Sequence, residues 1–197
     1  MRDLVGLVVK VLVVGALVIG AVAGIVLLKR NADDHRASRG SIERVSDPRT
    51  GVSWDMYGTP TLEETTSDLI LDAAAGVEIP VRIYTVDHGD WVERVQVFEV
   101  PPGEIDFTQA ALSTFDANID GELRDIEFIT VAGFDGATGS TDGTVVQKGE
   151  RREVDSQVFA SQIRATMVTG GVARRPGTDS VDVAEDAQTL WESVEQA

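Results

Sequence analysis

One uninterrupted apolar run near the start of the chain constrains its architecture more than any other feature. Val11–Leu28 contains 18 residues and no charge. At about 1.5 Å per helical residue the run spans about 27 Å, which is close to the thickness of a bilayer core. Lys10 precedes it, and Lys29 and Arg30 follow it. We therefore predict a single-pass transmembrane anchor over residues 1–30, in contact with membrane lipid.

The flanks of this run bear on cleavage and on orientation. The small residues Ala21-Val22-Ala23 resemble a signal peptidase site, but they lie inside the apolar run, whereas such sites normally follow it. We therefore expect the anchor to stay uncleaved. Basic residues are more numerous just after the run than before it. Counted by the positive-inside rule alone, they predict that the rest of the chain lies in the cytoplasm.

The charge of the remaining chain excludes several classes of function. Residues 1–49 carry eight basic and five acidic residues, whereas residues 50–197 carry nine basic and 28 acidic ones. The second part therefore has a formal net charge of −19, which repels a phosphate backbone, and we expect no binding of nucleic acid. The chain has no cysteine and only two histidines, which excludes disulfides, thiol catalysis and metal sites built from several histidines.

The pattern after the apolar run predicts a linker and one domain. Residues 31–49 are polar and without periodicity, which indicates a charged linker. From residue 50 the chain changes to short alternating runs, which predict a domain over 50–197. Alternating apolar residues on both sides of the Asp87–Asp90 turn predict a β-hairpin over 77–100.

Further elements complete the predicted domain. We expect strands over residues 52–56, 127–132 and 158–169, and turns at 58–60 and 140–143. Apolar residues four positions apart predict a helix over 105–118, and a stripe from Val183 to Val194, with Asp182 as N-cap, predicts a C-terminal helix. The predicted fold class is α+β, with an N-terminal transmembrane helix followed by a mostly antiparallel sheet packed with an inserted helix and a C-terminal helix.

This order of elements resembles the PsbP-like α/β/α sandwich domains of membrane-anchored or exported bacterial proteins. The resembling segments are the opening strand Gly51–Trp54 with its Gly-Thr-Pro turn, the hairpin 77–100, the helix near 106–118, the segment Ile129–Gly136, the strand 158–169 and the terminal helix. The resemblance implies a non-enzymatic binding or assembly module with a protein or cell-envelope partner, located outside the cytoplasm. This location opposes the charge count, and we favour it because a short N-terminal tail with Arg2 and Lys10 can also stay inside.

One segment matches a known metal-binding pattern. Residues 116–127 fit the twelve-residue calcium loop of the EF-hand, D-x-[DN]-x-[DN]-G-x5-E. The candidate calcium ligands are the side chains of Asp116, Asn118, Asp120 and Glu127 and the backbone carbonyl of Glu122. Carboxylate and carbonyl oxygens are the ligands that Ca²⁺ prefers.

An acidic turn without metal is the alternative interpretation of this segment. Ile119 is β-branched where the loop needs a turn-forming residue, and Arg124 places a cation where an oxygen ligand or a water is expected. Residues 126–131 also favour a strand over the exiting helix of an EF-hand. We assign no catalytic residues: His88 with Asp87 and Asp90 is more typical of a solvent-facing turn than of a catalytic triad.

Overall fold

A computed structural model divides the chain into two compact units, Met1–Gly40 and Ser41–Ala197. The structure describes residues 40–67, 79–100, 110–111, 114, 123–147, 150–178 and 181–196. The predicted membrane span over 11–28 lies outside these residues. Within the described ranges, no helix has the length and the hydropathy needed to cross a membrane.

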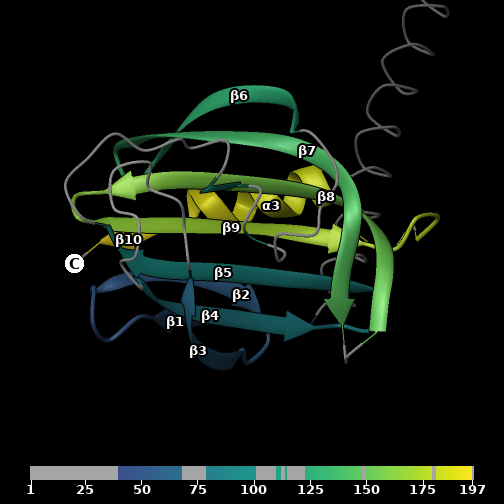
Figure 1. The fold of residues 1–197 in the computed structure, drawn as a ribbon, viewed down its shortest axis with the longest axis horizontal. Coiled ribbons are helices and arrows are strands. Elements are labelled where there is room, and N and C mark those ends of the chain that lie inside the picture. Colours follow the sequence, from purple (N-terminus) through teal and green to yellow (C-terminus); the bar gives the residue numbers. More distant parts are fainter. Residues whose placement is uncertain are drawn as a thin grey trace, which may run out of the picture. The chain divides into compact units, whose positions relative to one another are not determined.

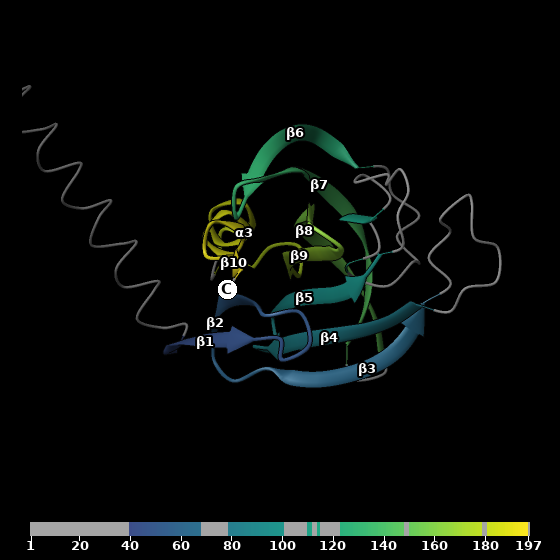
Figure 2. The ribbon, with the colours of Figure 1, turned by 90° about the vertical axis from the view of Figure 1, so that its left-hand side faces the viewer.

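An antiparallel sheet of seven strands forms the centre of the second unit (Figure 1). Its strands follow the order β3-β4-β5-β9-β8-β7-β6, with β3 at one edge and β6 at the other. Their bounds are β3 Thr61–Ser67, β4 Ile79–Asp87, β5 Trp91–Glu99, β6 Arg124–Val131, β7 Phe134–Gln147, β8 Glu150–Ile163 and β9 Thr166–Arg174. Figure 2 shows how strongly the sheet curves between β3 at its lower edge and β6 at its upper edge.

A small sheet and a helix cover one face of the large sheet. The small sheet has the order β1-β2-β10, from β1 Ile42–Ser46, β2 Val52–Tyr57 and β10 Glu195–Gln196. The helix α3 spans Val183–Glu192. Apolar side chains of both pack on the large sheet, where Trp54 contacts Tyr84 edge-on with ring centroids 4.9 Å apart. Burial of this apolar surface is the main stabilising term for such a layer.

The opposite face of the large sheet carries a second core. Ile79, Val81, Phe98 and Met167 are buried there, together with Ala110 and Ala111 from the chain between β5 and β6. Because both faces are covered, β5 is buried at every position except Glu99. The buried polar residues of β5, Glu93, Arg94 and Gln96, therefore need partners inside the protein, and Gln96 and Arg94 donate to the carbonyl of Thr114.

The hairpin and the C-terminal helix are confirmed. β4 and β5 pair antiparallel around the predicted turn, from Val81 opposite Phe98 to Asp87 opposite Val92. Helix α3 begins after Asp182, whose carboxylate accepts hydrogen bonds from the backbone N–H groups of Ala184 and Glu185. This is the N-cap that the sequence predicted, because the first amides of a helix have no partner inside it.

The predicted linker over 31–49 is wrong for its last part. Residues 42–46 form β1, which pairs with β2 from Ile42 opposite Tyr57 to Ser46 opposite Ser53. The segment carries little apolar alternation because only Val45 is buried in β1. Its register comes from β2, a partner that its local sequence does not reveal.

Two further predictions, a turn at 140–143 and a single strand over 158–169, were wrong. The predicted turn at 140–143 lies inside β7, where pairing with β8 places Ser140 opposite Gln157 and Gly143 opposite Val154. The predicted strand over 158–169 is instead the end of β8 and the start of β9, joined at Arg164 and Ala165. Arg164 takes a positive φ of 57°, a conformation that turns normally assign to glycine or asparagine, so the sequence carries no turn signal there.

The inserted helix over 105–118 falls largely outside the described residues. Ala110 and Ala111 are helical and Thr114 lies in a 3₁₀ turn. The carbonyl of Thr114 accepts hydrogen bonds from Gln96 at 3.0 Å and Arg94 at 3.4 Å, which attaches this segment to β5. The other residues of the predicted helix stay a prediction.

Candidate functional site

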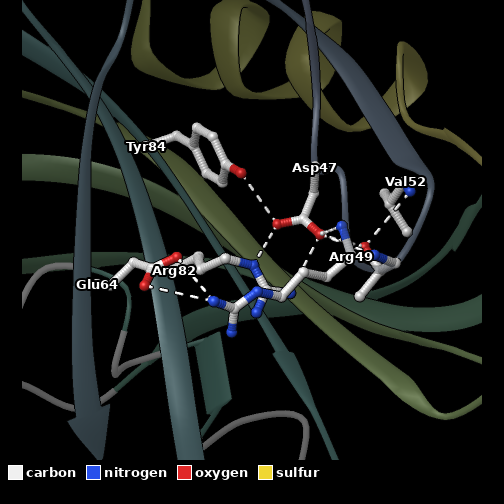
Figure 3. Close-up of polar contacts among 7 residues, drawn as sticks. Asp47, Arg49, Val52, Glu64, Arg82 and Tyr84 are labelled. Carbon is white, nitrogen blue, oxygen red and sulfur yellow. Dashed lines mark hydrogen bonds and ion pairs between the residues drawn. The ribbon is translucent and has the colours of Figure 1, made fainter.

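A buried carboxylate joins the turn between β1 and β2 to the large sheet (Figure 3). Asp47 is fully buried, and one of its oxygens, Oδ2, accepts hydrogen bonds from Arg82 Nε at 2.5 Å and Tyr84 Oη at 2.9 Å. The other oxygen, Oδ1, accepts from Arg82 Nη2 at 3.1 Å and from the backbone amides of Arg49 and Thr50 at 3.0 and 2.8 Å. The hydroxyl of Thr50 donates to the same oxygen at 2.9 Å. We call Asp47, Thr50, Arg82 and Tyr84 the Asp47 cluster.

The electrostatics of the Asp47 cluster favour a fixed charge state. Burial acts to raise the pKa of Asp47, but the hydrogen bonds from Arg82, Thr50 and Tyr84 outweigh it and lower this pKa to about 2. Burial and the neighbouring Asp47 raise the pKa of Tyr84 to about 12. Because the described hydrogen bonds engage both oxygens of Asp47 within the chain, we assign the cluster a structural role.

A groove lies between helix α3 and the β6–β8 part of the sheet, and it is the candidate binding site. Figure 2 shows α3 beside the arch formed by β6 and β7. The groove has a volume of about 530 Å³, within the range of small-ligand and side-chain pockets. Its lining residues are Asp125, Glu127, Ile129, Thr130, Thr138, Ser140, Gln157, Ala184, Gln188, Trp191 and Glu192.

The chemistry of the groove is acidic and rich in hydrogen-bonding groups. Three carboxylates line it, Asp125 and Glu127 from β6 and Glu192 from α3, and none of its described lining residues is Lys, Arg or His. Ser140 donates to Asp125 at 3.0 Å, and Gln188 donates to Glu192 at 2.7 Å. These bonds hold two carboxylates in place and leave acceptor capacity open, because a carboxylate has about four acceptor positions.

Strand β6 forms one wall of the groove and is unusually exposed. Six of its eight residues are exposed, and only Val131 is buried. Phe128 is 90% exposed and Ile126 is 48% exposed. Among the strands that the structure describes, β6 pairs with β7 alone; we call its second edge, which has no partner among these strands, the open edge. An exposed aromatic residue on an open edge marks a candidate interaction surface.

The predicted calcium ligands are only partly described. Asp116, Asn118, Asp120 and Glu122 lie outside the described residues. Glu127 lies on β6 opposite Thr138, so residues 124–131 form the strand that we favoured over an EF-hand helix. In the part of the chain that the structure describes, no group of three or more His, Cys, Asp or Glu side chains is placed to hold a metal ion.

His88 lies in the predicted turn but does not face solvent. Its ring stacks on Trp91, with centroids 3.6 Å apart and planes 7° apart, and its side chain is 16% exposed. Its Nε2 lies 4.0 Å from a carboxylate oxygen of Glu93, which accepts a hydrogen bond from the backbone amide of Tyr57. The turn lies where the sequence predicted it, with Asp87 and Asp90 exposed, but the imidazole itself does not face solvent, because the ring of Trp91 covers it.

The groove was not predicted from the sequence. Its walls come from three strands and a helix that lie apart in the sequence, and its carboxylates resemble the many other acidic residues of the chain. One signal for an interaction surface was available in the sequence. In Ile126-Glu127-Phe128 two apolar residues flank an acidic one, and all three are exposed on β6.

Of the comparisons with known proteins, the one with solved structures bears on the fold. No protein-family model matches the chain, and no curated protein matches it either. The solution structure of cyanobacterial PsbP (CyanoP) from Synechocystis sp. PCC 6803 is similar, with a TM-score of 0.51 and 14% sequence identity. The similarity covers 80% of this chain and 94% of that chain. The chain therefore has a PsbP-like fold, as the sequence resemblance implied, and at this identity the likeness concerns the fold alone.

Proposed function

We propose that the protein is a single-pass, membrane-anchored binding or assembly module without catalytic activity. Its domain would hold a partner protein or cell-envelope component at the groove between α3 and β6. The observation that carries this proposal is the groove itself, an acidic site of about 530 Å³ whose wall is an exposed edge strand. An open, two-walled site of this kind suits a protein segment, which needs both a strand edge and side-chain pockets.

The nature of the lining residues supports binding rather than catalysis. Acyl or phosphoryl transfer needs a nucleophile beside a base, or a cation to stabilise developing negative charge. The described lining residues offer hydroxyls, amides and carboxylates without a histidine or a basic residue among them. The PsbP-like fold agrees with a binding or assembly role by analogy.

The apolar run over 11–28 supports the anchored location. Its length suits a bilayer core. We further propose that this unit lies outside the cytoplasm. Digestion of intact cells with an added protease tests the orientation: loss of the 41–197 unit supports it, whereas full protection places the unit inside.

Site-specific photo-crosslinking tests the binding role. A photoreactive residue replaces Gln188, an exposed groove residue, and in a matched control it replaces Glu63, which is exposed on β3 at the opposite edge of the sheet. We expect the probe at position 188 to give a discrete protein adduct in intact cells that the probe at position 63 does not give. Equal labelling from both positions, or none from position 188, would contradict a binding site in the groove.

Calcium binding by residues 116–127 is a second candidate function. It rests on the sequence pattern of this segment, of which the structure describes only residues 123–127, with Glu127 exposed on β6. Titration calorimetry with CaCl₂ on the wild type and on Glu127→Gln tests it. Heat in the wild type that the variant loses supports a site that uses Glu127. Absence of heat in both proteins contradicts calcium binding.

A further inference from the structure

We propose that β6 accepts an added β-strand from a partner protein, and that this partner strand alternates basic and apolar residues. The inference rests on the proposed binding function and names the chemistry of the partner. It follows from three observations: the open edge of β6, the distribution of its side chains over the two faces of the sheet, and the charge of the groove.

The first observation is the regular backbone of the second half of β6. A bulge distorts its beginning: Arg124 lies opposite Ser140 and Glu127 opposite Thr138, so β6 has one extra residue, and Asp125 has a φ of 51°. From Glu127 to Val131 the register with β7 is continuous. This stretch is the part of β6 whose backbone is regular enough to pair with another strand at its open edge.

The second observation is that neighbouring side chains of β6 serve different surfaces. Glu127 lies opposite Thr138, and both line the groove. Phe128 lies opposite Ala137, so it projects from the other face of the sheet, where it is 90% exposed. A strand added beside β6 would therefore place every second side chain at the groove and the remaining ones beside Phe128.

The third observation selects the type of residue on each face. The side chains at the groove would meet Asp125, Glu127 and Glu192 with no described cation among the lining residues, so lysine or arginine fits there. Those on the other face would meet Phe128, so apolar residues fit there. Trp191 also lines the groove, and an indole ring is a suitable neighbour for a cation.

The same charges argue against a second copy of this chain as the occupant. Pairing two β6 strands would bring Asp125 and Glu127 of each copy close to the acidic groove of the other. Residues 50–197 carry a net charge of −19, which adds a repulsion over the whole contact. A basic partner is attracted by both features.

A peptide titration tests this proposal. The full-length protein in nonionic detergent micelles is titrated with a labelled peptide of about ten residues, in which lysine and valine alternate, and the dissociation constant is measured by fluorescence anisotropy. A peptide with the same residues in two separate blocks is the control for composition. We expect the alternating peptide to bind roughly tenfold more tightly than the blocked one, and to bind more weakly as salt concentration rises.

Variants and hydrogen exchange locate the bound strand. We expect Glu127→Lys to weaken the alternating peptide roughly tenfold and Phe128→Ser to weaken it by a smaller factor, whereas Glu63→Lys at the opposite edge leaves it unchanged. Amide hydrogen exchange over 127–131 should slow when the peptide binds. Glu127→Lys and Phe128→Ser change exposed side chains, so both variants are expected to fold.

Several results would overturn the proposal. Equal binding of both peptides, equal effects of Glu63→Lys and Glu127→Lys, or unchanged exchange over 127–131 would each exclude strand addition at β6. A dimer of the full-length chain that Phe128→Ser disrupts would assign the edge to a second copy instead. If the crosslink from position 188 forms while the peptide fails to bind, the groove binds a partner in another way, and only the strand-addition proposal is lost.

Discussion

The Asp47 cluster and the groove beside β6 both concentrate carboxylates, but they use them in opposite ways. Asp47 is fully buried, and both of its oxygens accept hydrogen bonds from groups of the same chain. In the groove, Asp125, Glu127 and Glu192 are exposed, and the hydrogen bonds described for them leave acceptor capacity unused. In so acidic a chain, a carboxylate whose oxygens are hydrogen-bonded within the protein has a structural role, whereas one with unused acceptor positions is available to a partner.

The physical basis of this contrast is the cost of removing a charge from water. A buried carboxylate is tolerated only when donors replace its hydration, and here Arg82, Tyr84 and the Thr50 backbone and side chain do so. The groove carboxylates keep their hydration and therefore need no such donors. A partner that binds there must supply donors of its own to compensate the water it displaces.

The largest expected effect is on the Asp47 cluster. Asp47→Asn keeps the shape of the side chain but leaves Arg82, which is 3% exposed, as a buried charge without its counterion. We expect the free energy of unfolding to fall by about 3–5 kcal/mol. Urea unfolding followed by tryptophan fluorescence measures it, and Trp54, which contacts Tyr84, lies close enough to report on the cluster.

The control for this variant is an ion pair on the surface. Glu64 pairs with Arg49 at 3.3 Å, and both side chains are more than half exposed. Because exposed pairs are screened by solvent, Glu64→Gln should cost less than about 1 kcal/mol. Equal losses in Asp47→Asn and Glu64→Gln would show that the buried cluster contributes no more than a surface contact.

Acid should remove part of the same stabilisation in the wild type. The pKa of Asp47 is lowered in the folded state to about 2 from 3.8, so its contribution is complete above pH 3.8 and is lost as the pH falls through 2. The difference corresponds to about 2 kcal/mol. Unfolding measured from pH 5 to pH 2 on the wild type and on Asp47→Asn isolates this term, because the stability gap between them should narrow as the pH falls. A constant gap would contradict the lowered pKa.

Removing one donor from the cluster should have a smaller effect. Tyr84→Phe deletes the 2.9 Å hydrogen bond to Asp47 Oδ2, while Arg82 Nε still donates to that oxygen. We expect a loss of about 1–2 kcal/mol, smaller than in Asp47→Asn because no charge is left unpaired. Urea unfolding at neutral pH measures it.

Alkaline unfolding provides the control for Tyr84→Phe. The pKa of Tyr84 is raised in the folded state to about 12 from 10.0, so its contribution is complete below pH 10 and is lost as the pH rises through 12. The wild type should therefore lose more stability over this interval than Tyr84→Phe does. Equal alkaline losses in the two proteins would show that the phenol is not held in its protonated form.

The fold was predicted from the sequence where the signal is local. The hairpin over 77–100 and the helix after Asp182 each contain their own pattern, namely two alternating runs around a turn and an apolar stripe behind an N-cap. The turn at Arg164 and Ala165 was missed because its positive φ falls on an arginine, where no local rule predicts it. Strand β1 was missed although its partner β2 follows directly after the turn that contains Asp47, because only Val45 of β1 is buried and the segment therefore has no apolar alternation.

Of the candidate site residues named from the sequence, Glu127 alone is among the described residues that line the groove, and the rest of the groove was not predicted. Its acidic residues cannot be distinguished from the other carboxylates of the chain until β6, β7 and α3 are brought together. The exposure of Phe128 was equally hidden: a phenylalanine in an apolar strand is normally buried, and only the position of β6 at the edge of the sheet leaves it in solvent.

The smallest expected effect on stability is at the open edge of β6. Phe128 is 90% exposed, so Phe128→Ser removes little buried apolar surface, and we expect the free energy of unfolding to change by less than about 0.5 kcal/mol. The buried Phe98 on β5 is the matched control, since Phe98→Ala should cost about 3–5 kcal/mol through the cavity it leaves. Urea unfolding of both variants makes the comparison. A loss above about 1 kcal/mol in Phe128→Ser would mean that the ring stabilises its own chain, and the edge would then no longer be free to accept a partner strand.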